Sequence, residues 1–339
     1  MPILEGRTMR VWYDACTGKH VRYGTAIAKR LNDVGHEVVL TTREHPDTLP
    51  MVKYLNEKFI TIGKYNPESL LTRLKEGVKR QLLFCKLFQE SAATPSIAIS
   101  HCSVDQCRVA FGLGIPIIVT MDTPYADAVN RLTLPIADYI VASKAIPKEL
   151  LDNYNVKAKI MQFDGADEVA WIKGFKSRVK YDFGKPLIVV RQVEEKAAYT
   201  NAKVDMLALA KKLTRLGTVV FLSRYNRERV KDLIVPKGFV DSASLMAEAD
   251  LFVGVGGTIT REAALQGTPA IIIKLYPEQH VNDFLAARGF PIFKTDASEA
   301  PKLAQKLLGE KRNVRHLLDK LENPVDVIEK IVEDHAHEN

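Results

Sequence analysis

The sequence predicts an α/β protein with two doubly wound parallel sheets that face a cleft. First, short β-branched runs alternate with amphipathic stretches of helical length along most of the chain. Second, this alternation fades once, between Asp164 and Lys185, where glycines and lysines gather. Third, 339 residues suffice for two domains. Because repeated βα units form parallel sheets covered by helices, an interrupted series indicates two such domains.

The first half opens with a strand over Met9–Asp14 and a helix over Val21–Val34, which Gly35 ends as a C-cap. Ile27 and Leu31 belong to the apolar face of that helix. The later strands are expected at His36–Thr41, Phe59–Ile62, Ile97–Ser100, Ile115–Thr120, Tyr139–Ala142 and Lys159–Gln162. The helices between them are expected at Pro46–Asn56, Leu70–Glu90 and Val104–Leu113.

The second half resumes the alternation after the glycine- and lysine-rich stretch. Its strands are expected at Leu187–Arg191, Val219–Leu222, Leu251–Val253 and Ala270–Ile273. Its helices are expected at Ala202–Arg215, Asn226–Asp232, Ser242–Ala249, Ile259–Gln266 and Gln279–Arg288, with a helical tail over Ser298–Glu333. We therefore expect domains at 1–164 and 186–339, a linker at 165–185, and a last helix that can cross back to the first domain.

Composition places the chain among ordinary globular proteins, with 46% apolar and 26% charged residues. No apolar run approaches the roughly 18 residues of a membrane helix, and residues 1–8 contain no signal-peptide core. The four cysteines form no CxxC pair, which argues against a disulfide framework and a metal site. We expect a cytoplasmic protein without bound metal or cofactor, with at most peripheral membrane contact.

The formal net charge of +7 fits either a solvated basic surface or attraction to phosphate groups. No nucleic-acid-binding signature accompanies the charge, so a phosphate-bearing small molecule is the expected partner and nucleic acid is not. Walker A, GxGxxG, HExxH and GxSxG motifs are absent. These absences argue against P-loop NTPases, zinc proteases and α/β-hydrolases.

The strongest local motif is the glycine-rich stretch Gly254–Glu262, which follows an apolar strand and opens a helix. At Gly254, Gly256 and Gly257, the backbone can approach a phosphate without obstruction by a side chain. The helix N-terminus adds a partial positive charge of about +0.5. Thr258 could cap this helix or bind a phosphate oxygen, and Glu262 could accept hydrogen bonds from ribose. The alternative is a tight strand–helix turn.

A second strand–helix junction, Asp14–His20, also has polar residues. Asp14 ends the strand, Gly18 and Lys19 form the turn, and His20 starts the helix. A histidine at the carboxyl end of a strand can act as a base or a phosphate ligand. The alternative is that His20 only begins the helix.

Four further residues follow or end strands. His101 comes directly after one strand and Asp122 after the next, so the two are expected to lie side by side for acid–base work. Arg191 and Arg224 end strands in the second half and could neutralise a pyrophosphate. Surface salt bridges are the alternative for both arginines.

Together these motifs resemble a mostly archaeal family catalogued as domain of unknown function, family 354. The resemblance runs from Met9 to about Leu308. The matching stretches are Asp14–Val21, Ile99–Ile117, Asn130–Pro135, Asp241–Leu245 and Gly254–Pro269. That family looks like a branch of the GT-B glycosyltransferase and UDP-N-acetylglucosamine 2-epimerase superfamily. The resemblance implies a GT-B fold with two Rossmann-like domains.

The resemblance also implies roles for particular residues. Thr17–Val21 is similar to the TGGHV-type turn of the bacterial cell-wall transferase of that superfamily. Thr260–Ala264 resembles its ribose-binding helix, which implies that role for Glu262. Gln279 and His280 resemble its Gln-His segment, where sugar hydroxyls would bind.

We therefore expect transfer of a sugar from a nucleotide-sugar, with UDP-sugars first, to an acceptor that could carry lipid or phosphate. The expected diphosphate ligands are Gly256, Gly257 and Thr258, and His20 is the expected base, with Asp122 and His101 as alternatives. GT-B enzymes generally need no metal, because a helix dipole and cations stabilise the leaving diphosphate. Two other functions stay open: a nucleotide-sugar 2-epimerase or hydrolase of the same fold, and a non-catalytic nucleotide-binding protein.

Overall fold

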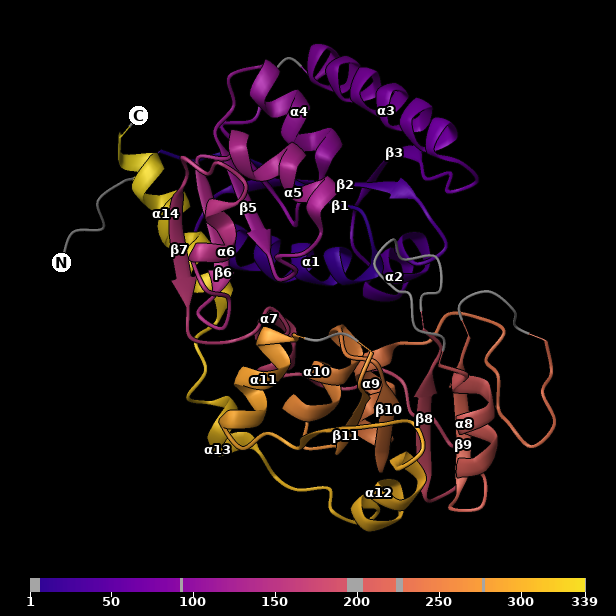
Figure 1. Cartoon of the computed structure of the whole chain (residues 1–339). Coiled ribbons are helices and arrows are strands. Elements are labelled where there is room, and N and C mark those ends of the chain that lie inside the picture. Colours follow the sequence, from indigo (N-terminus) through magenta and orange to yellow (C-terminus); the bar gives the residue numbers. More distant parts are fainter. Residues whose placement is uncertain (1–6, 92–93, 194–203, 224–227, 276–277, 339) are drawn as a thin grey trace. The chain divides into compact units, whose positions relative to one another are not determined.

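The computed structural model describes residues 7–91, 94–193, 204–223, 228–275 and 278–338. The chain divides into two compact units (Figure 1). Unit 1 comprises Met1–Trp171 and Glu322–Asn339, and unit 2 comprises Ile172–Leu321. Each unit contains a parallel sheet whose strands alternate along the chain with helices, which confirms the predicted fold class.

Unit 1 contains a seven-stranded sheet in the order β3-β2-β1-β4-β5-β6-β7, with every neighbouring pair parallel. The strands are β1 Arg10–Ala15, β2 Glu37–Glu44, β3 Ile60–Lys64, β4 Ile97–Ser100, β5 Ile117–Met121, β6 Tyr139–Ser143 and β7 Lys159–Phe163. β4 and β5 are buried along their whole length, as expected for central strands covered on both faces. The strand order reverses beside β1, so the β1 and β4 carboxyl ends form the switch point where ligands bind in such sheets.

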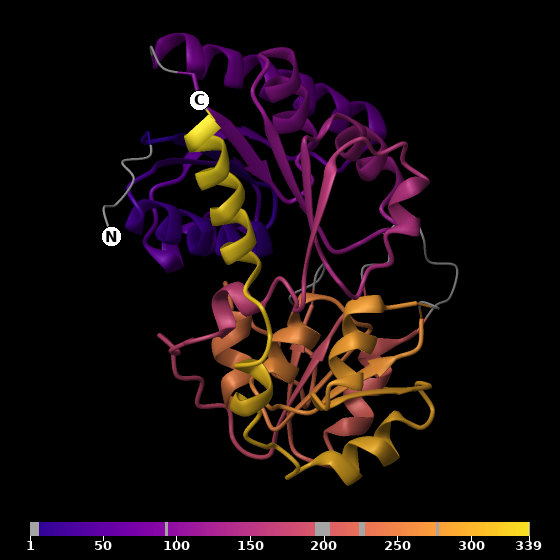
Figure 2. The same cartoon turned by 90° about the vertical axis from the view of Figure 1, so that its left-hand side faces the viewer.

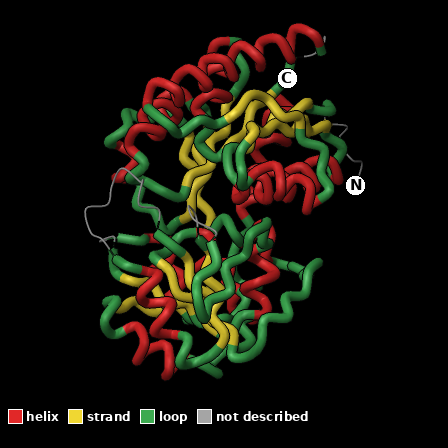
Figure 3. The backbone as a smooth tube through the Cα atoms, turned by 90° about the vertical axis from the view of Figure 1, so that its right-hand side faces the viewer, coloured by secondary structure: helices red, strands yellow, loops and turns green. Residues whose placement is uncertain are grey.

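The helices of unit 1 lie on both faces of this sheet. They are α1 Gly18–Asp33, α2 Thr48–Leu55, α3 Leu70–Glu90, α4 Val104–Gly112, α5 Asp127–Thr133, η1 Leu134–Ile136, α6 Glu149–Asp152, α7 Val169–Ile172 and α14 Pro324–Glu338. α3 and α4 cover the face opposite α1 (Figures 1 and 3). Hydroxyl caps fix where three of these helices begin: Thr17 for α1, Ser69 for α3 and Ser103 for α4.

The last helix returns to unit 1, where α14 packs against α1 and the strands β6 and β7 (Figure 2). Arg30 of α1 donates to Asp326 and Glu329 of α14, at 2.6 Å in each case. Residues 165–171, which the sequence assigns to a linker, also belong to unit 1. Apolar burial explains this placement, since Val169 and Trp171 are core residues.

Unit 2 contains a five-stranded parallel sheet in the order β12-β11-β10-β8-β9. Its strands are β8 Leu187–Arg191, β9 Thr218–Leu222, β10 Leu251–Gly254, β11 Ala270–Ile273 and β12 Ile292–Thr295. Its helices are α8 Met206–Leu213, α9 Ser242–Glu248, α10 Thr258–Leu265, α11 His280–Ala287, α12 Ala300–Leu307 and α13 Arg315–Leu318. Successive residues of the central strands belong alternately to two apolar clusters, so both faces of the sheet are buried.

One expectation for unit 2 is wrong, and the structure adds detail in two other places. The described part of Asn226–Asp232 is loop and turn, because the segment continues to Ile234, whose backbone bonds with β9. The tail over Ser298–Glu333 is largely helical, as expected, and it is divided into three helices, since Gly309, at φ +89°, follows the end of α12. No strand was expected at β12, because its apolar run is too short to give a clear strand pattern.

Candidate functional site

The predicted polar cluster of unit 1 forms at the carboxyl ends of β1, β4 and β5. The parallel register places Asp14 beside Ser100 and Ser100 beside Val119. His101 and Asp122 directly follow β4 and β5, and Lys19 lies in the first turn of α1 after β1. The structure therefore brings His101 and Asp122 together, as the shared strand edge predicts, and adds Lys19 to them.

Lys19 is the centre of this cluster. Its ammonium Nζ donates to Asp122 Oδ2 at 2.6 Å and to Asp167 Oδ2 at 2.8 Å. It also lies 3.4 Å from His101 Nε2. One lysine thus balances two carboxylates in a largely buried setting, where an unpaired charge would be costly.

His101 connects the cluster to the sheet. Its Nδ1 is 2.8 Å from the Thr120 hydroxyl, and its Nε2 is 3.2 Å from Asp122 Oδ1. Asp122 Oδ1 also accepts a hydrogen bond from the Thr123 hydroxyl. These contacts hold the Asp122 carboxylate in one orientation while 13% of its side chain stays exposed. A carboxylate that is both oriented and accessible can accept a proton from a substrate.

Sequence reasoning missed Asp167, because it lies in the stretch where the strand–helix pattern fades. His101, Asp122 and Asp167 offer three ligand atoms within 4.8 Å of one another, a donor set that could hold a metal ion. The Lys19 ammonium contacts both of these carboxylates. The expected absence of a metal stays a prediction.

His20, the predicted base, lies beside the cluster with its ring 4.8 Å from that of His101. Burial lowers the pKa of His20 well below 6.5, and the neighbouring His101, Lys19 and Arg43 lower it further. The ring is therefore neutral at pH 7. Its Nδ1 accepts the Cys16 backbone N–H at 3.3 Å, which places the proton of the neutral ring on Nε2. In this tautomer His20 is a donor through Nε2, and its Nδ1 is already occupied by the Cys16 N–H. Its role as a base stays a prediction.

The lowered pKa of His20 predicts a loss of stability in acid. Below pH 6.5 the unfolded chain binds a proton that the folded chain does not, so the free energy of unfolding should fall as the pH falls. We expect a shallower decline between pH 7 and pH 5 in His20→Asn, measured for unit 1 by hydrogen–deuterium exchange corrected for the intrinsic pH dependence of exchange. His316→Asn, which removes an exposed imidazole on α13, is the control. Equal slopes in the parent and His20→Asn would contradict the assignment.

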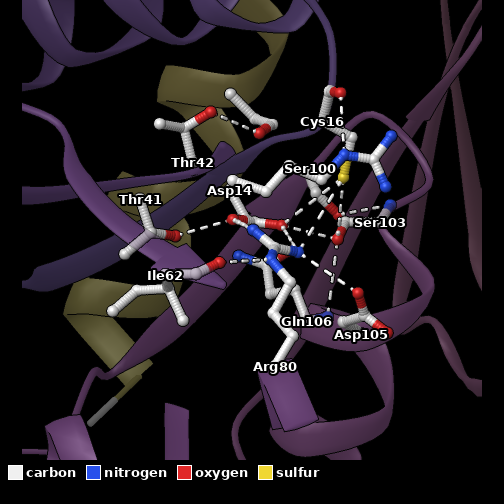
Figure 4. Close-up of polar contacts among 12 residues, drawn as sticks. Asp14, Cys16, Thr41, Thr42, Ile62, Arg80, Ser100, Ser103, Asp105 and Gln106 are labelled. Carbon is white, nitrogen blue, oxygen red and sulfur yellow. Dashed lines mark hydrogen bonds and ion pairs between the residues drawn. The ribbon is translucent and has the colours of Figure 1, made fainter. Parts of the chain in front are cut away.

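Asp14 belongs to a separate, fully buried network (Figure 4). Arg80 of α3 binds it through two hydrogen bonds, Nη2 to Oδ1 at 2.6 Å and Nη1 to Oδ2 at 2.9 Å. The hydroxyls of Thr41 and Ser103 donate to the same carboxylate at 2.8 and 2.6 Å.

Burial by itself would raise the pKa of Asp14, but the Arg80 charge and these hydrogen bonds together lower it. These four hydrogen bonds all end on the two carboxylate oxygens, so each oxygen of the buried Asp14 has two hydrogen-bond donors. Asp14 therefore holds β1, α3 and the start of α4 together.

The glycine-rich turn of unit 2 is the second candidate feature. Gly256 and Gly257 both have positive φ, at +101° and +93°, a conformation that L side chains rarely adopt. Gly257 is exposed and is the N-cap of α10, and Thr258 is the first helical residue rather than the cap. The first N–H groups of a helix have no intrahelical partner, so they can bind an anion.

Gln279 packs against this turn. A Cβ on Gly256 would lie 2.0 Å from Gln279 Oε1, whereas a Cβ on Gly257 would meet nothing within 4 Å. The Gln279 side chain donates to Val255 O at 3.0 Å and accepts from Asn282 at 2.6 Å. The structure thus brings Gln279 to the turn and adds the buried Asn282, which the sequence pattern did not indicate.

The remaining predicted residues of unit 2 have different settings. Glu262 lies inside α10 with only 1% of its surface exposed, and His280 pairs with Glu278 at 3.4 Å. Arg191 ends β8 and is half-buried. Arg224 lies outside the described residues. The roles of these four side chains stay predictions.

The comparisons with known proteins agree with this architecture. The family described as "Protein of unknown function (DUF354)" matches residues 9–337. The uncharacterized protein MJ0665 of Methanocaldococcus jannaschii is 30% identical over 338 residues, covering 94% of this chain and 96% of that protein.

Solved structures share the fold at low sequence identity. UDP-GlcNAc 2-epimerase of Methanocaldococcus jannaschii, solved with UDP-GlcNAc and UDP, is similar with a TM-score of 0.69 at 15% identity, over 96% of this chain and 99% of that one. The glycosyltransferase VinC, solved with dTDP, is similar with a TM-score of 0.61 at 13% identity, over 98% and 100%. These similarities confirm a GT-B type fold.

Proposed function

The chain belongs to the DUF354 protein family, and we propose that it is a glycosyltransferase that moves a sugar from a nucleotide-sugar to an acceptor. The observation that carries this proposal is the turn at Gly256 and Gly257. Two successive positive-φ glycines at the end of β10 expose the backbone N–H groups that open α10. Such a turn suits a diphosphate, because N–H groups and the helix dipole both favour negative charge.

Two structures of the same fold support a nucleotide-sugar as the ligand. One was solved with UDP-GlcNAc and UDP and the other with dTDP, and each of these ligands contains a diphosphate. We propose that Gly257 and Thr258 bind the diphosphate, with Gln279 supporting the turn. Arg191, at the end of β8, would neutralise charge on the leaving group.

The Lys19 cluster of unit 1 supplies the acid–base chemistry in this proposal. Asp122 would take the proton of the acceptor hydroxyl as the new glycosidic bond forms and the nucleoside diphosphate leaves. Lys19 and His101 would position Asp122 through the contacts described above. Asp167 would keep Lys19 in place.

A second candidate function is 2-epimerisation or hydrolysis of a nucleotide-sugar. The density of titratable groups around Lys19 favours it, since epimerisation needs several acid–base side chains on one sugar and no acceptor. Incubating the protein with UDP-, GDP- and dTDP-sugars and following the sugar by NMR distinguishes the two. A changed sugar without acceptor supports epimerisation, and turnover only with acceptor supports transfer. Binding without turnover under any acceptor would leave a non-catalytic protein.

The diphosphate site predicts a matched pair of glycine variants. Gly257→Ala and Gly309→Ala each place a methyl group at a positive φ, +93° and +89°, where it would meet nothing within 4 Å. Both should lose similar stability, on the order of 1–3 kcal/mol. Only Gly257→Ala should lower UDP affinity, by about tenfold or more, because its methyl group lies at the phosphate-binding turn. Calorimetry with UDP measures this difference, and equal affinities in the two variants would exclude the turn as the diphosphate site.

A further inference from the structure

The outer face of α3 is apolar, although its inner face already supplies the core. Arg80, Phe84 and Phe88 are buried beneath the helix. On the opposite side, five aliphatic side chains are between 49% and 80% exposed. These residues, which we call the α3 stripe, are Leu70, Leu71, Leu74, Val78 and Leu82. Their spacing of three or four residues places most of them along one side of the helix.

The neighbouring helices of unit 1 carry further exposed apolar side chains. α3 packs beside α4, and α4 packs beside α5, all within unit 1 (Figure 1). Phe111 at the end of α4 and Leu132 on α5 are exposed by more than half of their surface. A row of large exposed apolar side chains along one helix marks an interaction site rather than ordinary surface variation.

Basic residues border the α3 stripe. Lys75, Lys79 and Lys86 follow one edge of it, and all three side chains are exposed. Glu76 and Glu90 are the acidic residues of α3; Glu76 lies 3.1 Å from Lys79, and Glu90 lies 3.7 Å from Lys86. Arg73 is a further exposed basic residue of α3, so its exposed surface combines leucines with a net positive charge.

We propose that the α3 stripe binds the surface of an anionic lipid bilayer. An interfacial helix buries its apolar face among the acyl chains while lysines beside that face contact anionic headgroups. A second copy of the same surface would bring like-charged lysine edges together, which disfavours self-association. No helix among the described residues is long and apolar enough to cross a bilayer, so the contact would be peripheral.

Vesicle co-sedimentation with the full chain tests this proposal. The protein should pellet with phosphatidylcholine vesicles that contain phosphatidylglycerol and should bind pure phosphatidylcholine much more weakly. The triple variant Lys75→Gln/Lys79→Gln/Lys86→Gln should lose about a hundredfold in affinity, since each basic residue near an anionic surface contributes roughly fivefold. The triple variant Leu74→Gln/Val78→Gln/Leu82→Gln should lose tenfold or more, because it removes the inserted apolar area.

Matched controls make the same changes elsewhere in unit 1. Lys29→Gln/Lys53→Gln/Lys58→Gln removes three exposed lysines outside α3, and Val34→Gln/Leu49→Gln/Ile60→Gln removes three exposed aliphatic groups. Both controls should bind as the parent does, and circular dichroism checks that all variants fold. Parent protein that stays in the supernatant with both vesicles overturns the proposal. Light scattering that shows a dimer converted to a monomer by the leucine variant, without vesicle binding, would assign the stripe to self-association instead.

Discussion

Replacing Arg80 with methionine should lower the free energy of unfolding by about 3–5 kcal/mol, the usual effect of removing one partner of a buried ion pair. Arg80 is 1% exposed and binds both oxygens of a fully buried Asp14. In Arg80→Met the carboxylate keeps the hydroxyls of Thr41 and Ser103 and a longer contact from the Cys16 thiol at 3.7 Å. Its charge then lacks a counterion in a low-dielectric setting, which is the physical origin of the loss.

Hydrogen–deuterium exchange is the measurement, because a chain of two units need not unfold in one step. Faster exchange should be confined to unit 1, above all to β1, α3 and the start of α4, which meet at the buried pair. The double variant Asp14→Leu/Arg80→Met should recover part of the stability, since the fully buried carboxylate is removed together with its counterion. The recovery should be partial because Asp105, 3.4 Å from Arg80, also loses a partner. Arg131→Met is the control, because Arg131 forms an exposed pair with Asp127. If Arg80→Met exchanges no faster than this control, the buried pair does not stabilise unit 1.

Replacing Asp122 with asparagine should lower kcat by roughly 10²–10⁴, the range expected for loss of a general base. Asparagine has nearly the same shape and keeps an oxygen that can accept from Lys19 or His101, but it cannot take a proton at neutral pH. Nucleotide affinity should stay at the parent value, because the proposed diphosphate turn belongs to unit 2. The comparison uses initial rates with the donor identified from the nucleotide-sugar panel.

Asp127→Asn makes the same chemical change at an exposed aspartate on α5 and should keep the parent rate. A small rate loss in Asp122→Asn, comparable with that control, would remove Asp122 from the mechanism. His20→Asn would then be the next variant to assay, although Nδ1 of His20 accepts a backbone N–H in this structure.

Local sequence determined much of the architecture. The glycine-rich turn, its strand and its helix lie within Leu251–Leu265, so nearest-neighbour periodicity and backbone freedom were enough to predict them. The adjacency of His101 and Asp122 followed from parallel strands ending at one edge. The helix predicted at Asn226–Asp232 is absent from the described part of that segment for the opposite reason. The neighbouring Ile234 forms backbone hydrogen bonds with β9, and only tertiary contacts decide that pairing.

The sequence by itself determined the two series of βα units, the turn at Gly256 and Gly257, and the strand edge where acid–base residues gather. Only the tertiary structure decided which charges pair there. Lys19 meets Asp167 across 148 residues of chain, and Arg80 meets Asp14 across 66. Helical periodicity also could not tell which apolar side of α3 is buried, since Phe84 and Leu82 are both apolar. Periodicity reports the local geometry of one element, whereas ion pairing and burial depend on which distant elements the packed sheet brings together.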